Sequence, residues 1–419
     1  SIPGFGNALP EELHRADARL LKEYGCNFVR LSHYPQHPAF LDACDELGIM
    51  LYAEITSWKS VSSSGAWRRA ARRQMRDLIL RDRHHPSIIL WGMGNESRSR
   101  TAYLELRKIA RELDPLRPVT YAENHLYRAR REKTIGIPDV WSVNYELEAF
   151  EEARNACRLQ NVIASECCNF PRSVKGDDGA ELIQVATLEY EWKLMQDRPY
   201  VAGHAVWSFT DYATEYRKRY RRQAGLYDAW RRPKLAAELF RARYAQEPFV
   251  TLFVTDPAGN PELHVFSNCD RIRLILQGKM PVSVEGHLHY PLSIDGPFAG
   301  AKAEGTRGGV TVHQELKAWS DAKAMAITVD DNPQPGRTVA VDLSIVDAIG
   351  TSVRDWNGHV TLSVEGNARL RAYTEAGEVQ ISRGEGRAYI QLDQPGGEVV
   401  IRASATGLET GFLTIKPRP

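Results

Sequence analysis

From about Leu9 to about Tyr244 the chain alternates between helical patterns and short apolar runs, and this alternation limits its fold more than any other feature. Proline near the start and glycine at the end mark several of the helices. The predicted helices cover residues 10–24, 38–47, 66–83, 103–113, 186–196 and 233–244. The predicted strands cover residues 26–31, 49–55, 88–96, 118–122, 139–145, 162–166 and 201–209. Repeated βα units of this kind predict a parallel sheet with helices outside it.

These seven strands are one short of a closed eight-stranded barrel. Residues 1–6 are a candidate for the stub of a first strand, truncated or incomplete, which would complete a (β/α)8 TIM barrel over residues 1–247. A doubly wound open sheet is the alternative, but the sequence contains no glycine-rich phosphate-binding fingerprint for it. The fold class we expect is therefore α/β, with a TIM barrel as the first domain.

After about Pro248 the pattern changes to short β runs with turn signals between them. The first series comprises residues 251–254, 262–266 and 273–276, with a hairpin tip at 277–279. A stretch rich in Pro and Asp at 330–336 precedes a second series, which includes residues 340–346, 359–364, 387–392 and 398–403. We predict two small all-β, immunoglobulin-like sandwich domains over residues 248–322 and 323–419, with a boundary somewhere in 322–336.

Charge and cysteine content argue against several classes of protein. The 54 Lys and Arg residues balance 53 Asp and Glu residues, so no global field predicts binding to nucleic acid or to a membrane. No apolar stretch approaches membrane-spanning length. The six cysteines form neither a disulfide framework nor a zinc motif, so we expect reduced thiols and no metal. A cytoplasmic location is favoured on this ground, and a secreted or periplasmic one is the alternative.

Polar and aromatic residues stand at the ends of the predicted strands. In a barrel the C-terminal ends of all strands meet at one face, so these side chains should converge there. They are Arg30, His33, Glu54, Trp58, Asn95, Glu96, Glu123, His125, Asn144, Tyr145, Glu166, Trp207 and Asp211. This mixture fits a polyol ligand, because hydroxyl groups need directional partners and the apolar face of a sugar ring stacks on aromatic side chains.

Two carboxylates stand out, Glu96 and Glu166, because each directly ends an apolar strand. Glu96 closes the run IILWGMGNE at 88–96, whose two glycines let the backbone approach a neighbour closely. Cleavage of a glycosidic bond needs such a pair, with one carboxyl as proton donor and the other as nucleophile or base. The distance between them separates a retaining from an inverting mechanism, and a sequence does not give that distance.

Four segments carry a resemblance to a known family. They are RLSHYP at 30–35, RDRHHPSI at 81–88, WGMGNES at 91–97 and AGHAVW at 202–207. In their order and spacing they resemble glycoside hydrolase family 2, which contains β-galactosidases, β-glucuronidases and β-mannosidases. The resemblance covers residues 9–244. VFSNCD at 265–270 also resembles the β-sandwich domains that follow the barrel in a subset of the β-galactosidases.

The resemblance implies a retaining exo-β-glycosidase in a TIM barrel, with β-galactosidase as the favoured activity. It implies that Glu96 is the general acid/base and Glu166 the nucleophile. Asn95 would hydrogen-bond the 2-hydroxyl of the sugar, and Tyr145 would lie beside the nucleophile. Neighbouring carboxylates push each other's pKa values apart, so one can stay protonated near neutral pH. The chemistry implied in this way uses no cofactor.

The rest of the expected substrate-binding set surrounds these four residues. Arg30 and His33 would line the pocket for the glycone, the sugar that is cleaved off, and Trp207 would form a stacking floor. Trp58 and His125 complete the set. Each strand-end residue also has a structural interpretation, as an ion pair or as packing at the mouth of the barrel.

Two basic segments allow further interpretations. Residues 68–83 carry Arg at helical spacing, which most simply forms a solvated outer face. RKRYRR at 217–222 follows the last predicted strand and is either surface charge or a site for a uronic-acid or sulfated glycone. The second interpretation makes a β-glucuronidase or related uronidase the main alternative activity.

Members of this family normally carry a jelly-roll and an immunoglobulin-like domain ahead of the barrel, and residues 1–8 lack the Asn-x-His-Glu-type ending usual there. An incomplete first strand would expose unpaired sheet edges. We therefore expect a homo-oligomer or a complementing N-terminal chain, unless that part has been lost. A carbohydrate substrate is the other expected partner, with no nucleic acid and no membrane. A non-catalytic carbohydrate-binding barrel, or one part of a split enzyme, is the alternative from another class.

Overall fold

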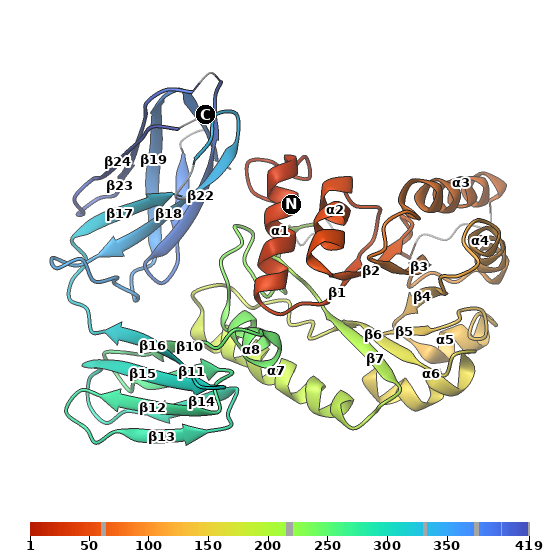
Figure 1. The fold of residues 1–419 in the computed structure, drawn as a ribbon, viewed down its shortest axis with the longest axis horizontal. Coiled ribbons are helices and arrows are strands. Elements are labelled where there is room, and N and C mark those ends of the chain that lie inside the picture. Colours follow the sequence, from red (N-terminus) through yellow and green to blue (C-terminus); the bar gives the residue numbers. More distant parts are fainter. Residues whose placement is uncertain (60–63, 215–220, 330–332, 373–376, 395, 418–419) are drawn as a thin grey trace. The chain divides into compact units, whose positions relative to one another are not determined.

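The computed structural model describes residues 1–59, 64–214, 221–329, 333–372, 377–394 and 396–417. The chain folds into two compact units. The first comprises His14–Pro171 and Ile183–Phe209, and the second comprises Ser1–Leu13, Arg172–Leu182 and Thr210–Pro419. Figure 1 traces both units in chain order from red to blue.

The first unit is built on a seven-stranded parallel sheet that forms a nearly closed barrel (Figure 1). Its strands pair in chain order and are β1 (Phe28–Leu31), β2 (Met50–Glu54), β3 (Ile88–Asn95), β4 (Val119–Glu123), β5 (Trp141–Asn144), β6 (Val162–Cys167) and β7 (Val201–Val206). Cα atoms of the two edge strands, β1 and β7, come within 8 Å of each other. The predicted barrel is confirmed, and all seven predicted strands have a counterpart in it.

The expectation that residues 1–6 form a first barrel strand is wrong. Ile2 pairs with Gly6 in an antiparallel bridge, and both residues belong to the second unit. Gly4 and Gly6 have φ values of 85° and 61°, which turn the chain back on itself instead of extending it. Ile2 is then buried in an apolar cluster with Leu13 and Tyr389 of the same unit. The barrel sheet therefore has seven strands within the described ranges.

One helix precedes β1 and others lie between successive strands, as the βα alternation predicts. They are α1 (Glu11–Glu23), α2 (Pro38–Leu47), α3 (Gly65–Asp82), α4 (Arg100–Leu113), α5 (Leu126–Arg131), α6 (Phe150–Ala156) and α7 (Asp178–Gln196), with a 3-10 turn at Leu147–Ala149. Pro38 opens α2 and Gly48, with a φ of 68°, closes it. The sequence pattern does not reveal α5 and α6, because both are short and lack a side-chain hydrogen bond at the N-cap. The Arg-rich segment forms α3, and two of its arginines pair with Glu105 of the adjacent α4.

Strand β3 is buried on both faces from Leu90 to Asn95, as its apolar run predicts. Leu90 joins Tyr52, Val140 and Ile163 in a buried apolar cluster. Trp91, the next residue, is also fully buried, and its indole N–H donates to Asp114 just after α4 at 3.0 Å. Successive side chains of a strand point to opposite faces, so both faces of β3 are covered and its C-terminal end is held rigidly.

The second unit contains four antiparallel sheets of three or four strands, and they form two sandwiches. In the first, the sheets β10-β11-β14 and β13-β12-β15-β16 share one core that includes Leu252, Leu263, Leu274 and Leu316. The strands are β10 (Val250–Thr255), β11 (Glu262–Ser267), β12 (Arg271–Leu276), β13 (Val282–Glu285), β14 (His289–Ser293), β15 (Gly300–Arg307) and β16 (Val310–Lys317).

In the second sandwich, the sheets β17-β18-β22-β20 and β21-β19-β23-β24 share a core that includes Val341, Ile390, Leu362 and Ile401. The strands are β17 (Ala324–Val329), β18 (Thr338–Val346), β19 (Gly358–Gly366), β20 (Ala368–Arg371), β21 (Glu378–Ile381), β22 (Glu385–Leu392), β23 (Val399–Ser404) and β24 (Gly411–Ile415). Two all-β sandwiches are thus present, while the domain limits at 248, 322 and 323 stay predictions.

The second unit also contains α8 (Leu235–Tyr244) and a short pairing of β8 (Tyr212–Ala213) with β9 (Arg221–Arg222). Residues 217–220 of the basic segment and 330–332 of the Pro- and Asp-rich stretch lie outside the described residues. Of the helices seen here, none combines the length and the apolar character needed to cross a membrane.

Candidate active site

Two glycines shape the end of β3. A Cβ on Gly92 would lie 2.3 Å from the Cβ of Glu54, so only glycine lets β3 pack this closely against β2. Gly94 has a φ of 144°, which L side chains rarely adopt. The register between β3 and β4 shifts between Gly92 and Asn95, and such bulges re-aim side chains next to functional sites. The glycines seen in the sequence therefore aim Asn95 and Glu96.

Hydrogen bonds from both sides fix the backbone around Glu96. The N–H of Asn95 donates to the carbonyl of Ser57 at 2.8 Å, and the N–H of Lys59 donates to the carbonyl of Asn95 at 3.2 Å. On the other side, the N–H of Glu96 donates to the carbonyl of Ala122 in β4 at 2.8 Å. The Glu96 side chain is buried. The backbone at Glu96 is thus held by β4 on one side and by the segment that follows β2 on the other, and this positions the carboxylate.

Three residues around the strand ends have left-handed backbone conformations. Lys59, Glu96 and Tyr145 have φ values of 52°, 45° and 66°. Such values are unfavourable for these residue types, and in folded proteins they gather at functional sites. Tyr145 follows β5, and its N–H donates to the backbone carbonyl of Glu166 at 2.9 Å. The strained positions therefore stand next to both carboxylates predicted to be catalytic.

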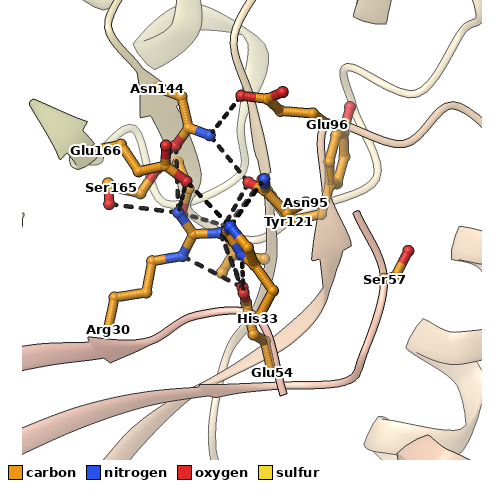
Figure 2. Close-up of polar contacts among 12 residues, drawn as sticks. Arg30, His33, Glu54, Ser57, Asn95, Glu96, Tyr121, Asn144, Ser165 and Glu166 are labelled. Atoms are coloured by element: carbon orange, nitrogen blue, oxygen red, sulfur yellow. Dashed lines mark hydrogen bonds and ion pairs between the residues drawn. The ribbon is translucent and has the colours of Figure 1, made fainter. Parts of the chain in front are cut away.

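Arg30 of β1 lies at the centre of the polar network (Figure 2). Its Nη1 donates to Glu166 Oε1 at 2.8 Å and to Asn144 Oδ1 at 3.4 Å. Its Nη2 donates to Glu54 Oε2 at 3.0 Å and to Asn95 Oδ1 at 2.8 Å. The Arg30 guanidinium is almost completely buried, and a buried cation needs such partners to be tolerated. Arg30 therefore positions the carboxylates and amides of the site.

Glu96 and Glu166 belong to one hydrogen-bond network. Asn144 Nδ2 donates to Glu96 Oε1 at 3.3 Å, while Asn144 Oδ1 accepts from Arg30, which also donates to Glu166. The second oxygen of Glu166 accepts a hydrogen bond from the Tyr145 hydroxyl. The structure thus brings both strand-end carboxylates together, with Asn144 and Arg30 between them.

The remaining oxygen of Glu96 has a different neighbour. Lys59 Nζ lies 2.9 Å from Glu96 Oε2, which makes the two an ion pair. Oε2 is buried and accepts no hydrogen bond from the residues that the structure describes. The charge attraction depends mainly on distance, so we regard the ion pair as real and Oε2 as incompletely satisfied.

The environments of the buried carboxylates shift their pKa values in opposite directions. Burial raises the pKa of Glu166 above its usual value of 4.5, although Arg30 and His33 oppose this effect. Burial also acts on Glu54, but there Arg30 and His33 outweigh it and the pKa is lowered. Glu54 is therefore a fixed anion that anchors Arg30.

His33 stands between two tryptophan rings. Its ring lies nearly parallel to Trp207, at 5.3 Å between centroids, and nearly parallel to Trp58, at 6.4 Å. Glu54 is an anionic acceptor, so His33 Nδ1, 2.7 Å from Glu54 Oε1, carries the proton of that hydrogen bond. His33 Nε2 then faces Glu166 at 3.8 Å. The expected aromatic surface is present beside the carboxylates.

Two other candidates have partners of their own. His125 directly precedes α5, and its Nδ1 lies 2.8 Å from Glu146 Oε1. Asp211 belongs to the second unit, where its Oδ1 accepts from Lys234 Nζ at 2.7 Å and from the N–H of Gly225 at 3.0 Å. Burial raises the pKa of Asp211 to about 6. These contacts favour the structural interpretation for both residues.

Sequence reasoning misses Lys59 altogether. It lies in the connection after β2, where no periodic pattern marks a functional position, and only the backbone pairing with Asn95 brings it to Glu96. The strand-end pattern includes Glu54 and Asn144 but assigns them no role. Their complete burial beside Arg30 shows that they hold the network together.

Asp42, Asp45 and His85 could offer ligand atoms to a metal, since these atoms lie within 4.8 Å of one another. Asp45 already accepts from His85 Nδ1 at 2.6 Å and from the N–H of Ser87 at 2.9 Å. These bonds fix the turn ahead of β3, at the end of the strand opposite to Glu96. We therefore interpret this cluster as structural.

Replacing Arg30 by Met should destabilise the barrel by about 3–5 kcal/mol, because it strips the buried Glu54 of its main partner. Arg15 is the control: its ion pair with Glu46 is partly exposed, and Arg15→Met should cost less than about 1 kcal/mol. Thermal unfolding of the purified variants measures both. Adding Glu54→Gln to Arg30→Met should restore part of the loss. Equal stability of the two single variants would contradict the role of Arg30.

Known proteins resemble the chain in sequence and in structure. Residues 2–168 match the TIM barrel domain of glycosyl hydrolases family 2. A β-galactosidase of Thermoanaerobacter pseudethanolicus is 28% identical, over 97% of this chain and 58% of that protein. A putative β-glucuronidase of Formosa agariphila is 24% identical, over 99% and 59%. The solved structure of a β-glycosidase from Bacteroides vulgatus has a TM-score of 0.83 at 20% identity, covering 99% of this chain and 63% of that one.

The chain spans about three fifths of the length of these relatives. The solved structure shares its fold, and the segment that matches the family's barrel domain contains β1 to β6, the strands that carry Arg30, Glu54, Asn95, Asn144 and Glu166. The match of residues 2–168 to the barrel domain, the related sequences and the common fold together show that the chain is similar to glycoside hydrolase family 2.

Proposed function

We propose that the protein is a retaining exo-β-glycosidase that removes terminal β-linked sugars, with β-galactosides as its substrates. One observation carries the proposal: two buried carboxylates, Glu96 and Glu166, share one hydrogen-bond network at the ends of β3 and β6. Glycoside hydrolysis by acid/base and nucleophilic catalysis needs such a pair of carboxyl groups. The proposed chemistry is supplied by these side chains and uses no cofactor.

Glu166 is the proposed nucleophile. One of its oxygens forms a bond to the anomeric carbon, on the face opposite to the leaving group, while the bond from that carbon to the leaving oxygen breaks. Arg30 and the Tyr145 hydroxyl hold its two oxygens and oppose the rise in pKa that burial causes. A carboxylate fixed through both oxygens suits attack on a positioned carbon better than activation of a mobile water. This supports retention of configuration over inversion.

Glu96 is the proposed acid and base. It gives a proton to the leaving oxygen in the first step. In the second step it takes a proton from water, whose oxygen replaces Glu166 at the anomeric carbon. The incompletely satisfied Oε2 of Glu96 supports this role, because a proton-transferring oxygen needs hydrogen-bonding capacity that the protein itself does not fill.

Asn95 and the aromatic side chains are the proposed contacts to the sugar. Asn95 Oδ1 accepts from both Arg30 and Asn144, at 2.8 and 2.9 Å. One amide N–H of Asn95 faces His33 Nε2, which lies 3.5 Å from Nδ2, and the other N–H is the proposed donor to a sugar hydroxyl. Trp207, whose ring lies nearly parallel to that of His33, is the proposed aromatic contact to the sugar.

The charges around the carboxylates support a neutral glycone. In the described part of the site, the cations that contact Glu54, Glu96 or Glu166 are Arg30 and Lys59, and each already faces a carboxylate. A uronic acid would add a further carboxylate to this network. The β-galactosidase relative, at 28% identity, favours the same choice. A uronidase is the alternative, supported by the β-glucuronidase relative and by the partly described segment 217–222.

Hydrolysis of p-nitrophenyl β-galactoside, β-glucoside, β-mannoside and β-glucuronide by the purified chain tests the proposal. The galactoside should react fastest, and ¹H NMR should show the β-anomer as the first sugar released. Preference for the glucuronide would transfer the assignment to the uronidase. Early release of the α-anomer would contradict retention. A folded chain without turnover would contradict the enzyme proposal and favour a carbohydrate-binding barrel or a part that needs a complementing chain.

A further inference from the structure

Lys59 contacts the proposed acid/base on the oxygen that does not face the nucleophile. Its Nζ is 2.9 Å from Glu96 Oε2 and 5.1 Å from the centre of the Trp58 ring. The other oxygen of Glu96 accepts from Asn144, which leads on to Arg30 and Glu166. The two oxygens of Glu96 therefore face different groups, and Lys59 belongs to the Oε2 side.

The backbone holds Lys59 and Trp58 in place at this position. Trp58 forms a parallel bridge with Asn95, and the N–H of Lys59 donates to the carbonyl of Asn95. The Lys59 side chain is 39% exposed and Trp58 is 37% exposed, so both reach solvent beside the buried carboxylate. A cation and a large aromatic ring are thus fixed at the rim of the site.

Proton donation by Glu96 changes the charge that Lys59 experiences. An ammonium group 2.9 Å from a carboxylate is a favourable pair, but the acid step requires the neutral, protonated form of that carboxyl. Lys59 stays near the same place in that step, because its backbone pairs with Asn95. An anionic group on the departing part of the substrate would be attracted by the Lys59 ammonium group, whereas a neutral leaving group would not.

We propose that Lys59 and Trp58 form a subsite for the leaving group and select substrates whose leaving group carries an anionic substituent, such as a carboxylate or a sulfate. This inference rests on the proposed function, because the acid role of Glu96 is what puts the leaving group beside Lys59. Trp58 supplies apolar surface for a sugar or aryl ring, and Lys59 supplies a charge-assisted hydrogen bond. The negative charge of the substrate then lies on the leaving side of the scissile bond.

A pair of matched substrates tests this subsite. The 4-carboxyphenyl and 4-carbamoylphenyl β-galactosides have leaving groups of nearly equal size, and only the first is anionic. From the usual strength of a charged hydrogen bond at a half-exposed position, we expect kcat/KM of the native enzyme to be about tenfold higher for the anionic substrate than for the neutral one. Lys59→Met should lower this ratio to about one, whereas Lys59→Arg keeps the charge and should keep a preference. Comparing ratios between variants cancels the intrinsic reactivity of the two leaving groups.

Lys108→Met is the matched control, because Lys108 of α4 is an exposed lysine that pairs with Glu112. It should leave the ratio at the value of the native enzyme. Salt gives a second measurement that needs no variant: raising NaCl should shrink the preference, since half-exposed charge pairs are screened. The ratio of the two substrates, rather than either rate alone, is the quantity to follow.

A ratio near one in the native enzyme would overturn the inference, and so would a ratio that survives in Lys59→Met. In either case turnover of both galactosides would leave the glycosidase proposal standing. If neither galactoside reacts and the p-nitrophenyl panel is also inactive, the glycosidase proposal itself fails, and the subsite fails with it.

Discussion

Replacing Glu166 by Gly is expected to lower kcat for aryl β-galactosides by at least about 10⁴-fold, since it removes the group that forms the covalent bond to the sugar. The change also leaves space beside Arg30 and Tyr145, which hold the carboxylate in the native site. Added azide should occupy that space and attack the anomeric carbon directly. The product should then be the α-galactosyl azide, identified by NMR, while release of the phenol gives the rate.

Glu123 provides a matched control for Glu166. It is a buried carboxylate at the end of β4, and burial raises its pKa in the same way. Its Oε1 accepts from the backbone N–H groups of Asn124 and His125 instead of from Arg30. Glu123→Gln should therefore keep kcat within about tenfold of the native value. Similar activity of Glu123→Gln and Glu166→Gly, or a β-configured azide product, would show that Glu166 is not the nucleophile.

The barrel and its two carboxylates are predictable because both depend on short-range pattern. Apolar runs flanked by helical segments define the strands, and the strand ends then define where side chains meet. The prediction that Glu96 and Glu166 lie close together needs no long-range information beyond this rule. Gly92 and Gly94 add a further local signal, since both are needed where β3 bends against β2.

The pairing inside the site is not predictable in the same way. Arg30 bonds Glu54, Asn95, Asn144 and Glu166, which come from four other strands, and the sequence does not say which strand-end group meets which. A prediction that treats all strand-end residues alike therefore includes His125 among the substrate-binding residues, although the structure pairs it with Glu146. Distances across the barrel decide such cases, and only the structure supplies them.

Lys59 and residues 1–6 show two further limits of local pattern. Lys59 has a left-handed conformation in a connection without periodicity, so nothing nearby marks it as a neighbour of Glu96. Residues 1–6 read as a strand stub, yet two glycines with positive φ values turn them back and Ile2 is buried among residues of the second unit. In both places the tertiary environment overrides what the local sequence favours.

Replacing Glu96 by Ala is expected to lower kcat/KM for phenyl β-galactoside by about 10²–10⁴-fold, the usual contribution of general acid catalysis. Phenolate is a poor leaving group and needs the proton that Glu96 supplies. 2,4-Dinitrophenolate leaves without a proton, so kcat/KM for its galactoside should fall by less than about tenfold. The two substrates are measured with the same variant, and a misfolded protein would lose both activities. An equal loss for both would contradict the role of Glu96 as the acid.

Azide then separates the roles of the two carboxylates. Loss of activity alone does not, because Asn144 and Arg30 link Glu96 to Glu166 in one network. In Glu96→Ala the nucleophile is intact, so the sugar becomes bound to Glu166 and waits for a base to activate water. Azide needs no base and should displace Glu166 to give the β-galactosyl azide. Glu166→Gly should give the α-product from the same substrate. Products of one configuration from both variants would refute the division of labour, whereas opposite configurations require an acid/base at Glu96 and a nucleophile at Glu166.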